Sequence, residues 1–231
     1  MIKALIFDFD GTLSNRQKNA YEVFNDYFRK YYPEFSDMEY EALLQDMMLY
    51  DCNGSISVRT RMYPFIQKYG KNLPDDFTEV FVPYYTNHMF EFCELKQETI
   101  EVLEKLKEEK YKLAIMSNGD SFSQHSKIRQ VDIEKYFDVV VVSGDIGIDK
   151  PDKRIYEYVA DKLGVQVKEC LMVGDVFSTD ILGAYNAEMP CAWMKTDPEK
   201  QADYYKGYTI SDLRQLFEIL DEVNGNEHTD S

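Results

Sequence analysis

The sequence is poor in the residues that mark non-globular chains. It has 11 glycines and 7 prolines among 231 residues, too few for a collagen-like or low-complexity chain. No apolar stretch approaches the ~20 residues that a helix needs to cross a bilayer, so we expect no membrane span. Hydrophobic residues make up 44% of the chain, which is typical of a globular protein that buries a large core.

Residues that bind soft metal ions or build disulfide frameworks are also scarce. The four cysteines form no Cys-x-x-Cys pair, and the three histidines are scattered. This spacing argues against the usual zinc motifs and predicts that the cysteines are buried as small apolar residues. The cysteines are Cys52, Cys93, Cys170 and Cys191.

Positive charge is in short supply. The 26 lysines and arginines face 42 acidic residues, which gives a formal net charge of −16. A field of this sign repels polyanions, so we expect no nucleic acid polymer as a partner. The N-terminal stretch reaches a charge at Lys3 and again at Asp8, too early for the core of a signal peptide, and we expect a cytoplasmic protein.

Short apolar runs recur along the chain and predict a parallel β-sheet. The runs are continuous rather than alternating, which is typical of strands buried on both faces. Helical periodicity lies between them, and this alternation predicts an α/β fold with a doubly wound parallel sheet. The runs are Ala4–Phe7, Leu113–Met116, Val139–Val142, Cys170–Val173 and Cys191–Met194, and helices are expected over 100–109, 123–130, 154–163, 178–187 and 211–223.

Residues 15–92 interrupt this alternation. They show only helical periodicity, enough for four helices, with turn signals at Asn53-Gly54 and again after Tyr69. We predict that they form a helical domain inserted into an α/β core made of residues 1–14 and 93–223. The polar residues 224–231 are predicted to be a disordered tail.

Polar side chains follow the predicted strands at the points where the strands end. Ligands of open parallel sheets bind outside the carboxyl ends of the strands, so we expect these side chains to lie together. Converging carboxylates repel one another unless a cation compensates them, and oxygen ligands without histidine or cysteine favour Mg²⁺. A lysine and a hydroxyl beside that ion would suit a phosphoryl group, with one carboxylate as nucleophile and another as proton shuttle. The residues are Asp8, Asp10, Ser117, Asn118, Gly119, Lys150, Asp175 and Asp180.

Four ordered motifs carry a resemblance to a known family. They are Asp8-Phe9-Asp10-Gly11-Thr12-Leu13, Ser117-Asn118-Gly119, Lys150-Pro151 and Gly174-Asp175-x4-Asp180. In this order, and over nearly the whole chain, they resemble the motifs of the haloacid dehalogenase-like (HAD) hydrolase superfamily. The insert after the first motif resembles the helical cap of the first subclass of that superfamily.

The resemblance implies a Mg²⁺-dependent phosphatase that hydrolyses a small phosphate monoester through an aspartyl-phosphate intermediate. It implies that Asp8 attacks phosphorus and that Asp10 protonates the leaving oxygen and later activates water. Asp10 is present here, whereas the dehalogenase branch lacks the second acid of this motif, which favours a phosphatase. It also implies that Ser117 and Lys150 hold the phosphoryl oxygens.

The remaining motif residues receive supporting roles from the resemblance. Mg²⁺ would bind Asp8, the backbone carbonyl of Asp10 and Asp175, with Asp180 in support. Thr12 and Gly119 would offer backbone N–H groups to the substrate. Asn118 is predicted to contact the substrate or, alternatively, only to form the turn.

The sequence leaves the substrate open. Three segments are similar to the nucleoside-monophosphate phosphatase branch, so a nucleoside 5′-monophosphate is one candidate: Ser117-Asn118-Gly119, the turn Asn53-Gly54-Ser55-Ile56-Ser57 and the run Cys191–Met194. A phosphosugar mutase and a phosphoglycolate phosphatase of the same superfamily are alternatives. A phosphoacceptor signalling domain is a candidate of a different class, but its phosphoacceptor follows a middle strand and it is about half as long as this chain.

The insert contains an unusual cluster of positive charge. Between Asp51 and Asp75 there is no acidic residue, while four basic residues occur, among them Arg59 and Arg61. We predict that these two arginines contact the expected partner, a small phosphorylated metabolite; the alternative is an ordinary solvated helix face. The choice between a monomer and a homodimer stays open.

Overall fold

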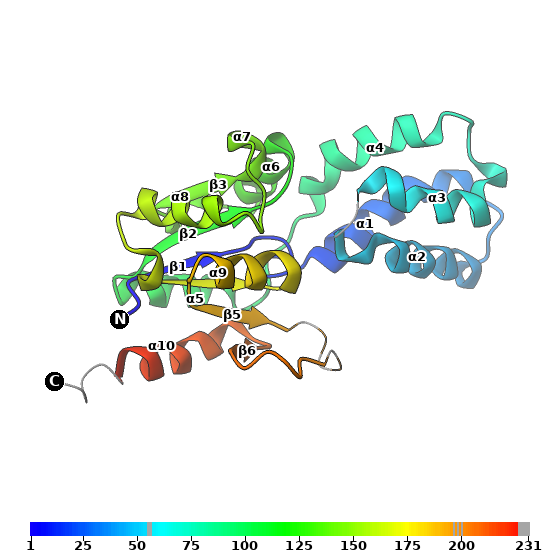
Figure 1. Cartoon of the computed structure of the whole chain (residues 1–231). Helices are drawn as coiled ribbons and strands as arrows, with labels where there is room; N and C mark the ends of the chain where they lie inside the picture. The colour runs from blue at the N-terminus through cyan, green and yellow to red at the C-terminus, as the bar shows by residue number, and fades with distance from the viewer. Residues whose placement is uncertain (55–56, 196, 198, 200, 226–231) are drawn as a thin grey trace. The chain divides into compact units, whose positions relative to one another are not determined.

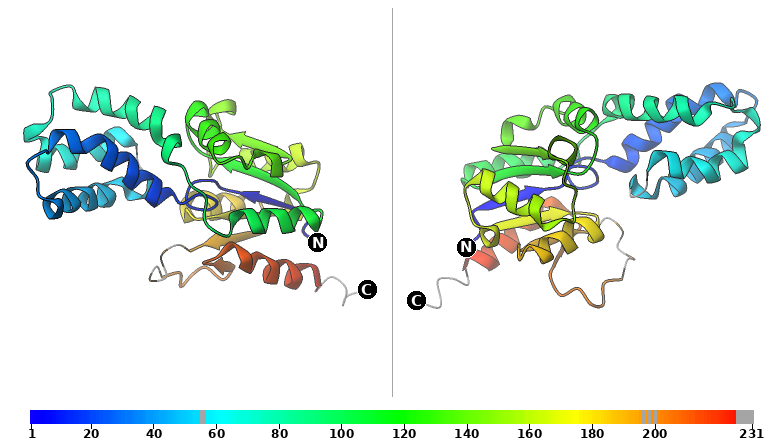
Figure 2. Two further views of the ribbon diagram at one scale, coloured as in Figure 1. Left: turned by 180° about the vertical axis from the view of Figure 1, so that it is seen from behind. Right: turned by 45° about the horizontal axis from the view of Figure 1, so that its top comes forward.

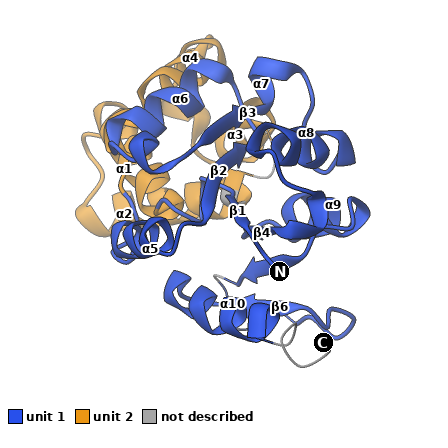
Figure 3. Cartoon of the chain, turned by 90° about the vertical axis from the view of Figure 1, so that its left-hand side faces the viewer, with its two compact units in different colours: residues 1–14, 95–231 blue, residues 15–94 orange. Residues whose placement is uncertain are grey.

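The chain forms two compact units. The computed structural model describes residues 1–54, 57–195, 197, 199 and 201–225. One unit consists of residues 1–14 and 95–231 and the other of residues 15–94, drawn in separate colours in Figure 3. The second boundary therefore lies two residues beyond the predicted one. The two ends of the insert are joined, because the Asn15 N–H donates to the Glu94 carbonyl (2.9 Å) and the Glu94 N–H donates to Asn19 Oδ1 (3.1 Å).

The first unit contains a parallel β-sheet, which confirms the predicted fold class (Figure 1). Within the described residues it has six strands in the order β3-β2-β1-β4-β5-β6, each parallel to its neighbours. The strand order reverses beside β1, which is where ligands of doubly wound sheets bind. The strands are β1 (Ala4–Phe7), β2 (Lys112–Ser117), β3 (Val139–Val142), β4 (Cys170–Gly174), β5 (Cys191–Met194) and β6 (Tyr208–Ile210).

Both faces of the sheet are covered, which explains the continuous apolar runs. Along β1, Ala4 and Ile6 belong to a core cluster with the buried side chains of the helix Lys153–Leu163. Leu5 and Phe7 alternate with them and point to the opposite face, and all four side chains are fully buried. Figure 3 shows α8 and α9 on one face of the sheet and α5 and α6 on the other.

The helices of this unit follow the predicted pattern with three differences. The helix predicted over 211–223 starts as a 3-10 turn, Leu213–Gln215, and becomes α-helical only from Leu216. The segment predicted as a helix from residue 178 starts with a π-helical turn, Phe177–Ile181. A short helix, α7, was not predicted. The helices are α5 (Thr99–Glu108), α6 (Ser121–Gln130), α7 (Ser143–Ile146), α8 (Lys153–Leu163), α9 (Leu182–Asn186) and α10 (Leu216–Gly225).

The second unit is the predicted helical insert, visible from two further sides in Figure 2. Its helices are α1 (Arg16–Phe28), α2 (Asp37–Asp51), α3 (Val58–Tyr69) and α4 (Phe77–His88). Its core is rich in aromatic rings, and the rings of Phe77 and Phe81 stack with centroids 5.5 Å apart. The many tyrosines of the insert therefore serve mainly in packing between helices.

Two further expectations have an outcome in the structure. No helix in the described part of the chain is long and apolar enough to cross a membrane. Cys93 and Cys170 are buried and Cys191 is partly buried, as predicted for small apolar side chains, but Cys52 is exposed in the turn after α2.

Candidate active site

The end of β1 places Asp8 beside the end of β4. The Asp8 N–H donates to the Val173 carbonyl (2.9 Å), so pairing with β4 continues past the last residue of the strand. The chain then turns back through Gly11, whose φ is +89°. A Cβ at Gly11 would collide with the Asp175 carboxylate, and the conformation itself disfavours other residues. Glycine is therefore required where the first and fourth motifs meet.

The end of β4 supplies two more carboxylates. Asp175 follows the strand directly, and Asp180 comes from the π-helical turn. The Val176 N–H donates to Asp180 Oδ2 (2.9 Å), which brings the turn over the strand end. A Cβ at Gly174 would collide with the side chain of Asp180, so this glycine allows the close approach.

Lys150 lies between two of these carboxylates. Its Nζ donates to Asp8 Oδ1 (2.6 Å) and to Asp180 Oδ1 (2.7 Å), and all three side chains are buried. The Asn118 amide holds the lysine from the backbone side: Nδ2 donates to the Lys150 carbonyl (2.9 Å), and Oδ1 accepts from its N–H (2.8 Å). In this structure Asn118 therefore fixes the backbone of Lys150, and its contact with the substrate stays a prediction.

The acidic cluster contains more negative than positive charge. Burial raises the pKa of the Asp8 carboxyl well above its ordinary value of 3.8; Lys150 opposes this shift, while Asp180 and Asp175 add to it. Burial disfavours the charge of Lys150, but Asp180 and Asp8 more than offset this effect and hold its pKa above the ordinary value. Burial lowers the pKa of Lys96, although the negative charges of nearby acids, Asp175 foremost, act to raise it. Three buried acids thus outnumber the two lysines near them.

This cluster has the composition of a binding site for a hard cation. Asp8, Asp175 and Asp180 each offer one carboxylate oxygen, and these atoms lie within 4.8 Å of one another. A divalent cation would offset the repulsion between the carboxylates. Oxygen donors alone suit Mg²⁺, which needs few protein ligands and keeps water or substrate oxygens in its remaining positions. The donor set therefore fits the ion that the sequence predicts.

Asp10 and Ser117 are held from α6 by two residues that the motifs did not reveal. The Lys127 ammonium pairs with Asp10 Oδ2, and Gln124 Nε2 donates to the same oxygen (3.0 Å). Gln124 also contacts Ser117 Oγ. The sequence offers only a weak signal for Gln124 and Lys127. They are two polar residues three positions apart, beside the apolar Ile128, on a helix that follows the end of a strand.

The two predicted backbone donors have different surroundings. The Gly119 N–H donates to Ser143 Oγ (3.0 Å), a bond that a substrate oxygen would have to replace. Thr12 is fully buried, and its hydroxyl has no hydrogen-bond partner among the described residues. Neither arrangement assigns a role to these N–H groups, which stay predictions.

The two arginines of the insert differ in their surroundings. Arg59 is exposed and pairs with Glu79 (2.9 Å). Arg61 is buried within the helical unit and pairs with Asp51, which also pairs with Arg16. The ordinary solvated face that we weighed as the alternative therefore describes Arg59 but not Arg61. Substrate contacts of both residues stay predictions, and the turn Asn53–Ser57 lies partly outside the described residues.

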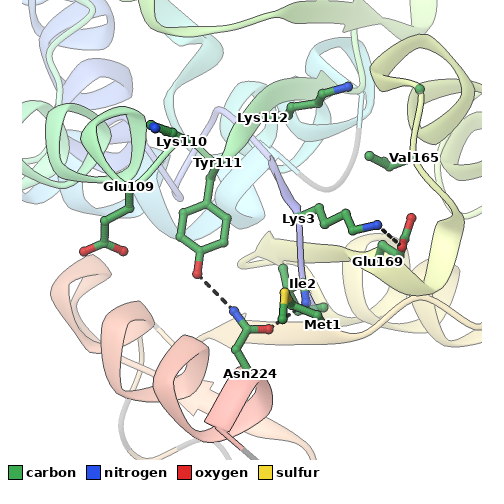
Figure 4. Close-up of a pocket in the computed structure, with 11 residues that line it drawn as sticks. Met1, Ile2, Lys3, Glu109, Lys110, Tyr111, Lys112, Val165, Glu169 and Asn224 are labelled. Atoms are coloured by element: carbon green, nitrogen blue, oxygen red, sulfur yellow. Dashed lines mark hydrogen bonds and ion pairs between the residues drawn. The ribbon is translucent and has the colours of Figure 1, made fainter. Parts of the chain in front are cut away.

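A pocket of about 460 Å³ lies at the opposite, amino-terminal end of the strands (Figure 4). Its polar side chains fasten neighbouring elements. Lys3 pairs with Glu169 (2.6 Å), and Asn224 bonds both to the Tyr111 hydroxyl (3.0 Å) and to the Ile2 N–H (2.7 Å). The helix α10 extends to Gly225, so Asn224 and Gly225 are helical, which corrects the predicted start of a disordered tail; residues 226–231 lie outside the described part.

Comparison with known proteins gives the family. Residues 5–194 match the sequence model of the family described as haloacid dehalogenase-like hydrolase. Glyceraldehyde 3-phosphate phosphatase of Pyrococcus furiosus is 27% identical, over 98% of this chain and 96% of that protein. Pyrimidine 5′-nucleotidase YjjG of Escherichia coli is also 27% identical, over 94% of this chain and 96% of its own length.

A solved structure agrees with this result. The HAD-hydrolase YfnB of Bacillus subtilis, bound to magnesium, has a TM-score of 0.78 and 23% identity, over 95% of this chain and 99% of that one. Such low identity establishes a common fold and nothing finer. The sequence match covers most of this chain, including all four motifs. The chain belongs to the haloacid dehalogenase-like hydrolase family.

Proposed function

We propose that this protein is a Mg²⁺-dependent phosphatase that hydrolyses small phosphate monoesters through an aspartyl-phosphate on Asp8. The observation that carries the proposal is the position of Asp8, whose carboxylate is held by Lys150 beside Asp175 and Asp180. Similar proteins support it. Their names give a glyceraldehyde 3-phosphate phosphatase, a pyrimidine 5′-nucleotidase and an N-acylneuraminate-9-phosphatase, which share a phosphate ester and differ in the leaving group.

In the first half-reaction, an Asp8 oxygen attacks phosphorus and the ester P–O bond breaks. Asp10 gives its proton to the departing alcohol oxygen, while Lys150 and Ser117 stabilise the charge on the phosphoryl oxygens. In the second half-reaction, Asp10 takes a proton from water, the water oxygen attacks phosphorus, and the bond to Asp8 breaks. Inorganic phosphate leaves, and both carboxyl groups return to their starting states.

Asp8, Asp175 and the Asp10 carbonyl would hold Mg²⁺, with Asp180 in support. When bound, the ion supplies positive charge that offsets the phosphoryl oxygens and the clustered acids. Asp180 already has two partners, Lys150 and the Val176 N–H. These bonds suit a residue that holds the lysine and the strand end in place.

The proposal is tested with a panel of phosphate monoesters. We expect Mg²⁺-dependent release of inorganic phosphate from p-nitrophenyl phosphate, and from at least one of nucleoside 5′-monophosphates, phosphoglycolate and triose or sugar phosphates. The panel is scored by kcat/KM, which measures discrimination between substrates. Excess EDTA should abolish turnover and Mg²⁺ should restore it. Isomerisation of a sugar phosphate without phosphate release would instead favour the mutase, and a single stoichiometric phosphorylation would favour a signalling domain.

Ion binding can be followed independently through Trp193, the one tryptophan of the sequence. It is buried, and its indole N–H donates to the Asp175 carbonyl (3.0 Å). We expect Mg²⁺ to change the Trp193 fluorescence in a saturable way that EDTA reverses. In Asp175→Asn the apparent affinity for Mg²⁺ should fall by about 10-fold or more. Replacing a residue that only orients a metal ligand already lowers metal affinity by about 10- to 100-fold. The exposed Asp161→Asn is the matched control; equal affinity in both variants would contradict a role of Asp175 in ion binding.

A further inference from the structure

Two buried polar residues of α6 face the candidate active site. Gln124 and Lys127 are three positions apart, so they lie on the same side of the helix. Only 3% of Gln124 and 5% of Lys127 are exposed to solvent. Polar side chains are rarely buried to this extent unless they have partners, so the partners indicate what these residues do.

Their partners are the two side chains to which the proposed mechanism assigns proton transfer and phosphoryl binding. Lys127 Nζ pairs with Asp10 Oδ2, and Gln124 Nε2 donates to the same oxygen at 3.0 Å. Gln124 also contacts Ser117 Oγ. The Lys127 ammonium lies 5.8 Å from the centre of the Phe9 ring, next to Asp10 in the chain. One helix face therefore holds Asp10 and Ser117 together.

Stability alone does not account for this arrangement. A buried ion pair is often no better for folding than well-packed apolar residues of similar volume. Proton transfer, in contrast, requires a carboxyl group within hydrogen-bond reach of the reacting oxygen, and small displacements of such groups are costly. About a fifth of the Asp10 side chain is exposed, so its orientation depends on the contacts that it makes.

We propose that Lys127 and Gln124 are positioning residues that orient the Asp10 carboxyl group for proton transfer. The inference rests on the proposed phosphatase mechanism. The competing explanation is that the two side chains only fasten α6 to the loop after β1. The two explanations differ in how the rate depends on the leaving group. An alkoxide needs a proton from Asp10 in order to leave, whereas p-nitrophenolate leaves well without one.

The experiment compares Lys127→Met and Lys127→Gln with the wild-type protein on two substrates. One is p-nitrophenyl phosphate, and the other is the alkyl phosphate with the highest kcat/KM in the panel. We expect kcat/KM for the alkyl phosphate to fall at least about 10-fold more than for p-nitrophenyl phosphate, a part of the 10²–10⁴-fold that general acid catalysis typically contributes. Lys127→Gln keeps a polar side chain in case the methionine variant does not fold.

Three further variants complete the design. Gln124→Ala should lower kcat/KM for both substrates, because Gln124 contacts Ser117, and should lower the alkyl value further. Gln130→Leu, at an exposed position of α6, and Lys135→Met, at an exposed lysine paired with Asp132, should change neither value. Circular dichroism and Tm confirm that the compared variants are folded.

The outcomes separate the inference from the function on which it rests. Equal losses on both substrates in the Lys127 variants, or no loss, would overturn the positioning role and leave the phosphatase intact. If the wild-type protein hydrolyses p-nitrophenyl phosphate but no alkyl phosphate, the positioning role is also overturned, because Asp10 would then protonate no leaving group. Turnover of neither substrate by the wild-type protein would reject the proposed function and this inference with it.

Discussion

Replacing Asp8 by asparagine is expected to abolish turnover and leave the protein folded. The asparagine oxygen still accepts a hydrogen bond from Lys150, but a neutral amide is a far weaker nucleophile than a carboxylate. Loss of a nucleophile that acts within a catalytic unit costs about 10⁴-fold or more in kcat. The measurement is phosphate release from p-nitrophenyl phosphate. Acid quenching during turnover should trap a phosphorylated protein in the wild type and none in Asp8→Asn.

The exposed Asp161→Asn is the control for this change, since it makes the same substitution on α8 away from the strand ends. It should keep wild-type turnover and phosphorylation. A purified Asp8→Asn protein that retains more than about 1% of wild-type kcat would contradict the nucleophile assignment, because general acid and phosphoryl-binding groups alone do not sustain that rate.

The same variant has a predictable effect on stability. The pKa of Asp8 is raised in the folded protein, so the folded state retains a proton that the unfolded chain has lost. Without a divalent ion, this group therefore lowers the free energy of unfolding as the pH rises from 3.8 towards the raised pKa. Asparagine carries no such cost. In EDTA at pH 7, we expect Asp8→Asn to have a higher Tm than the wild type, and the difference to shrink near pH 4.

The sequence predicts the central part of the sheet because the signal there is chemical and local. The continuous apolar runs of β1 and β4 have no polar residue to give them a second interpretation, and both strands are buried. The edge strand β6 could not be predicted, because its local sequence signal is weak. It has three residues, of which Thr209 is exposed, so it carries neither a long run nor a clear alternation. Its pairing with β5 fixes it, and pairing is not visible in a short segment alone.

The candidate site also contains residues that the sequence predicts and residues that it does not. Asp8, Asp175 and Asp180 could be predicted to meet because parallel strands end at a common edge, and the structure brings their oxygens together. The positions of Gln124 and Lys127 could not be predicted, because polar residues occur on several sides of a helix and only packing determines which side faces the strand ends. The burial of Arg61 could not be predicted for a similar reason, since it depends on the ion pair with Asp51 from another helix.

Replacement of Lys150 by methionine is expected to have the largest effect on stability. The lysine side chain is 2% exposed, and it is bonded to Asp8 and Asp180, whose side chains are 9% and 0% exposed. Methionine fills a similar volume but leaves the two carboxylates without this cation. Breaking a buried pair in this way costs about 3–5 kcal/mol. For a chain of this size, that free energy corresponds to a fall in Tm on the order of 10 °C.

A second substitution tests whether charge imbalance causes the loss of stability in Lys150→Met. If charge imbalance produces the loss, Asp180→Asn combined with Lys150→Met should recover part of the lost Tm, and saturating Mg²⁺ should stabilise Lys150→Met more than it stabilises the wild type. The control is Lys153→Met, three residues along the chain, whose exposed ammonium lies 3.6 Å from Glu157 and should contribute less than about 1 kcal/mol. A Lys150→Met protein as stable as this control would mean that Lys150 does not offset negative charge on Asp8 and Asp180, and the proposed balance between lysine, carboxylates and divalent ion would fail with it.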